Sequence, residues 1–208
     1  FFGIFQINFS ICKFGFIIIP VFSSMSSRNY LSTSSFSLII YTNKDFDSMP
    51  SPYLTNTVLD LVDIVDGYQW IASWETNRGC PFKCSFCDWG SLTQSKITKF
   101  DLDKVYKEWD WIVNNGIEYV HIADANFGVF YERDKEIVDY IVKCKKDTDF
   151  PHNVSATWYK NAAEKMIGLA KILEDVNLNK GFTLSVQSMN EETLDSIERK
   201  NMEMSKLA

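Results

Sequence analysis

The chain of 208 residues lacks long apolar runs, patches rich in lysine or arginine, and a cysteine count suited to a disulfide framework. Its apolar run at residues 14–22 contains Pro20 and is too short to span a bilayer. A net charge of −6 without a basic patch argues against a nucleic-acid-binding surface. Five cysteines are an odd number and too sparse for a small disulfide scaffold. We therefore expect neither a membrane nor a nucleic acid as partner.

The composition, with 46% hydrophobic and 23% charged residues, is that of a globular domain. Residues 1–49 differ from the rest, because they are rich in Phe, Ile and Ser, carry few charges before Lys44 and show no sustained periodicity. We expect an irregular or non-native N-terminal segment at 1–49 and one domain at 50–208.

From Pro50 onward, strand and helix patterns alternate. Four βα units of this kind predict an α/β fold with parallel strands joined by crossovers. In such sheets, ligands collect beyond the carboxyl ends of the strands. The predicted strands are 68–75, 117–123, 153–157 and 182–187, and the helices that follow them are 101–116, 133–145, 162–174 and one capped by Asn190.

Three cysteines fall within the stretch ETNRGCPFKCSFCDWG, directly after the first predicted strand. Cys80, Cys84 and Cys87 follow the spacing CxxxCxxC. Three thiolates can hold three corners of a [4Fe–4S] cluster and leave the fourth iron open, whereas a structural zinc site is normally closed by four protein ligands.

Other interpretations of the cysteines remain open. A zinc site would need a fourth ligand, and the remaining candidates lack the usual spacing. Those candidates are Cys12, His121, Cys144 and His152. Cysteines without a metal are the other alternative, so the motif is a hypothesis that the structural context has to support.

CxxxCxxC with an aromatic residue, Phe86, before the last cysteine resembles the signature of the radical S-adenosylmethionine (radical SAM) superfamily. The wider string RGCPFKCSFCDWG, with SPYL at 51–54, is most similar to the branch associated with a cobalamin-binding domain. The resemblance implies a partial (β/α) barrel, here truncated after about four βα units, in which Cys80, Cys84 and Cys87 bind the cluster. It also implies that the open iron chelates S-adenosylmethionine (SAM) and that Phe86 lies near the adenine.

The same resemblance suggests further cofactor contacts. ADANFG at 123–128 replaces the Gly-Gly-Glu type turn of many members, so Asp124 or Asn126 would accept from the SAM amino group and Gly128 would allow close backbone approach. An ordinary Asx turn is the alternative.

The predicted fourth strand and its helix resemble a segment that contacts the ribose and carboxylate of SAM. Ser185 and Gln187 share one face of that strand by its period of two, and Arg199 would pair with the carboxylate. A solvated arginine at a helix end is the alternative for Arg199.

The expected function is reductive cleavage of SAM to a 5′-deoxyadenosyl radical that abstracts hydrogen from a small molecule, with cobalamin-dependent methyl transfer or rearrangement as its outcome. Cobalamin would come from a missing domain, because the chain contains no DxHxxG string. We expect an electron donor such as flavodoxin or ferredoxin and a cytoplasmic location, since a cluster of this kind is oxygen-sensitive. The alternatives are a non-catalytic zinc- or cluster-binding domain and a cobalamin-independent enzyme such as a methylthiotransferase.

Overall fold

The structure, a computed structural model, describes residues 46–61, 69–87, 96–161, 163–179, 181–182 and 185–201. The chain divides into two compact units, Phe1–Phe46 and Asp47–Ala208. The expectation for 1–49 therefore lies almost wholly outside the described residues, and the fold below is that of the second unit. Among the described residues, no helix has the length and apolar character needed to cross a membrane.

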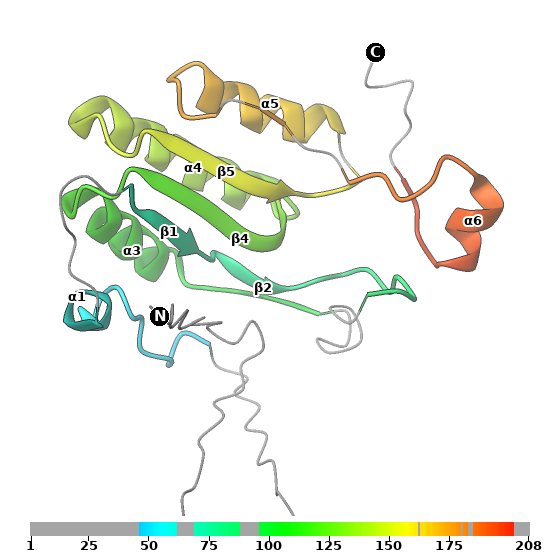
Figure 1. Ribbon diagram of the computed structural model, residues 1–208, viewed down its shortest axis with the longest axis horizontal. Coiled ribbons are helices and arrows are strands. Elements are labelled where there is room, and N and C mark those ends of the chain that lie inside the picture. Colours follow the sequence, from blue (N-terminus) through cyan, green and yellow to red (C-terminus); the bar gives the residue numbers. More distant parts are fainter. Residues whose placement is uncertain are drawn as a thin grey trace, which may run out of the picture. The chain divides into compact units, whose positions relative to one another are not determined.

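The centre of the second unit is a three-stranded parallel sheet in the order β1-β4-β5 (Figure 1). Its strands are β1 (Ile71–Trp74), β4 (Tyr119–Phe127) and β5 (Asn153–Trp158). Three of the four predicted strands are thus present and parallel, in agreement with the predicted α/β class.

Helices follow the strands as the apolar periodicity predicts. They are α3 (Leu102–Asn114), α4 (Tyr131–Thr148), α5 (Ala163–Glu174) and the short α6 (Glu191–Ser196), with α1 (Thr57–Leu61) ahead of the sheet. Asp101 caps α3 and Asn190 caps α6, each through its side-chain oxygen, as expected. Asn115 takes the C-cap of α3, and Gly116 follows with a left-handed φ of 67°.

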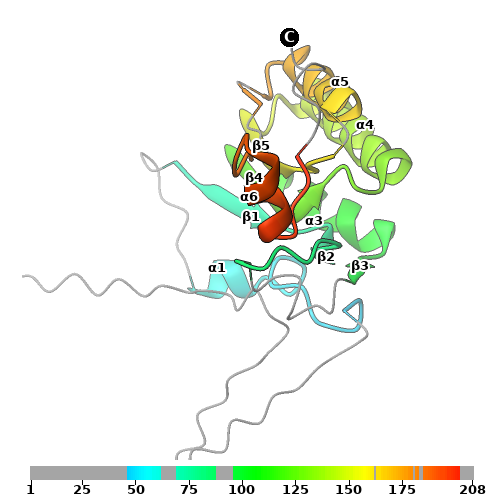
Figure 2. The same ribbon diagram turned by 90° about the vertical axis from the view of Figure 1, so that its right-hand side faces the viewer.

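The core lies between the sheet and α3, α4 and α5, which cover one of its faces (Figure 2). Along β1 the residues alternate between exposed and buried, because a strand points successive side chains to opposite faces. Trp74 on β1 packs against Trp109 on α3 with ring centroids 5.0 Å apart.

The predicted fourth strand, 182–187, is not a strand in its described residues, 182 and 185–187. Two contacts nevertheless place the chain after α5 along the free edge of β5. The carbonyl of Leu178 accepts a hydrogen bond of 2.7 Å from Val154 N, and the rings of Phe182 and Trp158 lie 5.4 Å apart. Both pairs have the same sequence offset, so Leu178 and Phe182 follow one another in the direction parallel to β5.

Candidate functional site

The cysteine loop leaves the sheet between two short strands that the sequence did not predict. β2 (Asn77–Gly79) follows β1 directly and pairs antiparallel with β3 (Ile97–Lys99). Gly79 has a φ of 119°, and a Cβ on it would lie 2.0 Å from the carbonyl oxygen of Lys96. Only glycine fits there, so the residue before Cys80 fixes where the loop begins.

The three motif cysteines have free thiols within this loop. Cys80 and Cys84 are buried, Cys87 is partly buried, and a hydrogen bond of 3.0 Å from Cys87 N to Cys84 O turns the chain between the last two. Within the described ranges, no group of three or more His, Cys, Asp or Glu side chains is placed to hold one metal ion. A cluster binds its thiolates on separate irons, and three thiols on one short loop suit it chemically.

Asn126 connects the second strand of the sheet to the first cysteine. Its side-chain nitrogen donates to Cys80 Sγ at 3.3 Å, and the residue is fully buried. Its Oδ1 is buried and has no hydrogen-bond partner in the described part of the chain. A buried amide oxygen without a donor costs free energy, so this atom is placed to accept from a bound ligand.

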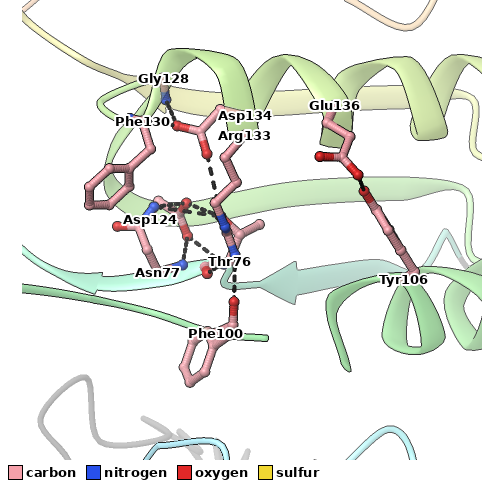
Figure 3. Close-up of polar contacts among 10 residues, drawn as sticks. All are labelled: Thr76, Asn77, Phe100, Tyr106, Asp124, Gly128, Phe130, Arg133, Asp134 and Glu136. Carbon is pink, nitrogen blue, oxygen red and sulfur yellow. Dashed lines mark hydrogen bonds and ion pairs between the residues drawn. The ribbon is translucent and has the colours of Figure 1, made fainter. Parts of the chain in front are cut away.

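Asp124 is fully buried beneath the loop and accepts four hydrogen bonds (Figure 3). Oδ1 accepts from Thr76 N at 2.6 Å and Asn77 N at 3.1 Å. Oδ2 accepts from Thr76 Oγ1 at 2.5 Å and Asn77 Nδ2 at 2.6 Å. Burial raises the pKa of Asp124 to about 7, although these hydrogen bonds oppose the rise. Because its acceptor positions are taken, the geometry favours Asn126 over Asp124 as the acceptor for an amino group.

The prediction that Asp124 and Asn126 lie in a loop after the strand is wrong, because β4 continues to Phe127. The pairing of β4 with β5 shifts register between Ile122 and Phe127. Several residues of β4 therefore oppose a single residue of β5, and such a bulge redirects side chains. Here it directs Asp124 and Asn126 toward the chain that leads into Cys80.

Two residues at the start of α4 form hydrogen bonds with the segments around Thr76 and Gly128 (Figure 3). Arg133 Nη2 donates to the carbonyl oxygens of Thr76 at 3.0 Å and Phe100 at 2.7 Å. Asp134 Oδ2 accepts from Gly128 N at 2.8 Å. The amide of Gly128 is thus already used by the protein.

Gly128 has a φ of 95°, and a Cβ on it would lie 2.1 Å from Met166 Sδ. In the structure this glycine allows close packing against α5, a role different from the predicted approach to a ligand.

Aromatic contacts hold the loop against the end of β5. The rings of Phe82 and Tyr159 stack at 5.9 Å, and Lys160 Nζ lies 5.6 Å from the Phe82 ring centroid. Tyr159 N donates to the carbonyl of Phe127 at 2.8 Å, which joins the ends of β4 and β5. The loop therefore lies at the carboxyl edge of the sheet, as the element order predicts.

The C-terminal segment also reaches this loop. Ser85 N donates to the carbonyl of Ile197 at 3.1 Å. Arg199 is buried, with 4% of its surface exposed, and its Nη2 donates to the carbonyl of Ser185 at 2.6 Å. Its Nε is buried without a partner, so Arg199 is not a solvated residue at a helix end. Its unpaired N–H points to an acceptor that the described residues do not supply.

The remaining predicted contacts are exposed. Phe86 has 55% of its surface accessible, and the side chains of Ser185 and Gln187 are also exposed. The structure thus brings Cys80 together with Asn126 and Ser185 together with Arg199. It shows no contact that joins Phe86 or Gln187 to them.

Sequence reasoning missed Thr76, Asn77, Arg133 and Asp134. Thr76 and Asn77 lie within the cysteine stretch itself, and their polar side chains at the end of a buried strand were an available signal. Arg133 had none, because its partners are the carbonyl groups of Thr76 and Phe100, which are distant in the sequence. Asp134 accepts from the nearby amides of Gly128 and Phe130, at the turn just before it.

Known proteins that are similar to this chain indicate its family. The family model of the radical SAM superfamily matches residues 74–205. The cobalamin-dependent radical SAM methyltransferase TokK of Streptomyces tokunonensis is 38% identical over 155 residues, which are 74% of this chain and 23% of TokK. A 2-(S-pantetheinyl)-carbapenam-3-carboxylate methyltransferase of Streptantibioticus cattleyicolor is 35% identical over 162 residues, with the same two coverages of 74% and 23%. The chain thus spans about a quarter of the length of these curated relatives.

Among solved structures, the chain is similar to the radical SAM methyltransferase TsrM from Kitasatospora setae, determined with tryptophan and a SAM analogue and also with cobalamin and a [4Fe–4S] cluster. The identity is 21% and the TM-score 0.49, over 60% of this chain and 23–24% of TsrM. This likeness is too weak to support an argument of its own. Since the family model spans more than half of the chain, from Trp74 on β1 to beyond α6, the chain belongs to the radical SAM superfamily.

Proposed function

We propose that this chain is the cluster- and SAM-binding part of a cobalamin-dependent radical SAM methyltransferase that acts on a small molecule. Its two curated relatives are both methyltransferases, and TokK is described as cobalamin-dependent. We further propose that residues 50–208 form the N-terminal part of the radical SAM core domain.

The observation that carries the proposal is the polar environment of Cys80. Its sulfur is buried and accepts a hydrogen bond from Asn126, whose carbonyl oxygen lacks a partner. An amide that contacts a ligand sulfur and still offers a buried acceptor suits a cofactor bound beside the cluster. We assign the cluster to Cys80, Cys84 and Cys87.

The neighbouring residues would orient SAM. Asn126 Oδ1 would accept from its amino group, and the unpaired Nε of Arg199 would donate to its carboxylate. Phe86 offers an exposed ring face to the adenine. Ser185 and Gln187, both exposed, would hydrogen-bond the ribose and carboxylate.

The chemistry belongs to the bound groups, and the protein supplies position and exclusion of water. A bound cluster would supply one electron to SAM, whose C5′–S bond would then break to give methionine and the 5′-deoxyadenosyl radical. Phe82 stacks on Tyr159 and so holds the cysteine loop against the end of β5. The Asp124 network fixes residues 76–77 ahead of the cysteines.

Other parts of the function lie outside this chain. We propose that cobalamin is supplied by another part of the protein, since no DxHxxG string occurs here. Electrons would come from a donor such as flavodoxin or ferredoxin, in the cytoplasm.

Anaerobic reconstitution with iron and sulfide tests the proposal, followed by EPR of the reduced protein with and without SAM. We expect a [4Fe–4S]⁺ signal that changes when SAM is added, together with release of 5′-deoxyadenosine. A preparation that binds zinc instead, or a Cys80→Ala variant that binds the same metal as wild type, would overturn the assignment.

A further inference from the structure

We propose that Asn126 tunes the cluster through its hydrogen bond to Cys80 Sγ and thereby raises the cluster's reduction potential. This inference rests on the proposed function, because it assigns a second task to the residue beside the cluster. The residue would be a positioning residue that acts through Cys80.

The geometry of the contact supports this task. Asn126 Nδ2 lies 3.3 Å from Cys80 Sγ, and both residues are buried. A side-chain amide has two N–H groups and one carbonyl oxygen, and here the nitrogen faces the sulfur while Oδ1 has no partner among the residues that the structure describes. The side-chain amide of Asn126 thus donates to the sulfur of Cys80 and keeps its own oxygen available to accept a hydrogen bond.

Two strands fix the contact between Asn126 and Cys80, because β4 carries Asn126 and β2 leads to Cys80. Asn126 lies in the irregular part of β4, two residues after Asp124. Asp124 binds the backbone amides of Thr76 and Asn77, and β2 then leads directly to Gly79 and Cys80. Asp124 therefore fixes the position of the Cys80 segment relative to β4. This brings the side-chain amide of Asn126 next to the sulfur of Cys80.

The electrostatic consequence has a definite sign. Reduction adds an electron, and part of its charge falls on the ligand sulfurs, so an N–H donor stabilises the reduced cluster more than the oxidised one. Because the contact is buried, water screens it little. Removal of the donor should therefore lower the reduction potential.

The test is an EPR-monitored redox titration of the reconstituted full chain, with the wild type, Asn126→Leu and Asn126→Ala. Leucine has the same number of side-chain heavy atoms as asparagine but no donor, while alanine serves if leucine does not fit. Asn114→Ala, at an exposed position of α3, is the matched control. Iron content per chain and circular dichroism report assembly and folding separately from the potential.

We expect a reduced-to-oxidised ratio about tenfold lower at fixed potential in the Asn126 variants, equivalent to about 59 mV for one electron. The Asn114→Ala control should match wild type. An Asn126→Leu variant, or Asn126→Ala if leucine blocks assembly, that carries a full cluster at the wild-type potential would overturn the inference. Failure of the wild type to assemble a cluster would instead contradict the proposed function.

Discussion

The buried side chains between the sheet and its helices differ in kind from those at the carboxyl edge of the sheet. Between the sheet and α3–α5, large apolar side chains such as Trp74, Trp109 and Ile122 fill the space with almost no exposed surface. At the carboxyl edge, buried polar groups take their place, with Asp124 and Asn126 both at 0% exposure. Apolar packing requires only volume and shape, whereas a buried polar group requires specific partners.

This difference separates what stabilises the fold from what prepares the site. Asp124 has its acceptors filled by protein donors, whereas Asn126 and Arg199 each keep a buried polar atom without a partner. The filled carboxylate orders the edge, and the free atoms of Asn126 and Arg199 are those that we propose a ligand would satisfy. Substitutions on the two sides should therefore have separable effects on folding and on cofactor chemistry.

The largest expected effect is loss of the cluster by a cysteine substitution at the edge. Cys80→Ala removes one of the three proposed ligands, so we expect the yield of 5′-deoxyadenosine to fall by on the order of a thousandfold or more, as is typical when an essential group is removed. Cys144→Ala, on α4 outside the motif, is the matched control and should retain the cluster. Iron analysis and product assay check both, and an active Cys80→Ala variant would contradict the ligand assignment.

On the packed side, Trp109→Ala should lower the free energy of unfolding by about 4 kcal/mol, because it leaves a large cavity beside Trp74. Denaturant unfolding of the cluster-free chain measures this. A loss below about 1 kcal/mol would mean that this side is not close-packed as described.

The pH dependence of stability tests the polar edge of the sheet, because the pKa of the buried Asp124 carboxyl group is raised. Burial raises the pKa of Asp124 from 3.8 to about 7, so the folded state holds this proton more tightly than the unfolded state. Its contribution to stability is complete below about pH 4 and is lost as the pH rises to about 7. At about 1.4 kcal/mol per pKa unit, a rise from 3.8 to about 7 corresponds to about 4 kcal/mol.

The check is the unfolding free energy of the cluster-free chain at several pH values, compared with Asp124→Asn, which cannot titrate. Asp134 and Glu108 also have pKa values raised by burial and add to the slope in the same direction. The slope of the wild type should therefore exceed that of Asp124→Asn. Equal slopes would show that the pKa of Asp124 is the same in both states.

The smallest expected effect lies at the start of α3. Asp101 Oδ1 accepts from Asp103 N at 2.8 Å, and Asp101→Ala should cost about 1 kcal/mol by removing this N-cap. Thermal unfolding measures it, with Asp103→Ala as a comparison on the same turn. Cluster binding should be unaffected, and a change in it would mean that α3 and the edge are coupled.

Local patterns were sufficient for the helices and for the parallel direction of the strands. Apolar spacing predicted α3 closely, and the positions of Asp101 and Asn190 predicted two caps, because such signals depend on neighbouring residues alone. Alternation of strands and helices also predicted that the cysteines lie at the carboxyl edge. The end of β4 was misplaced, because a strand that bulges to Phe127 has no local signature.

The sequence by itself determined the family, the α/β class and the three candidate ligands, since these follow from short spacings and from periodicity. Only the tertiary structure decided which polar residues surround Cys80. Asp124 and Asn126 are indistinguishable in sequence as acceptors, yet one has its oxygens filled and the other keeps one free. The reason is that hydrogen-bond partners come from strands nearly fifty residues apart, with separations of 48 and 46 residues for Thr76–Asp124 and Cys80–Asn126, and only folding brings them together.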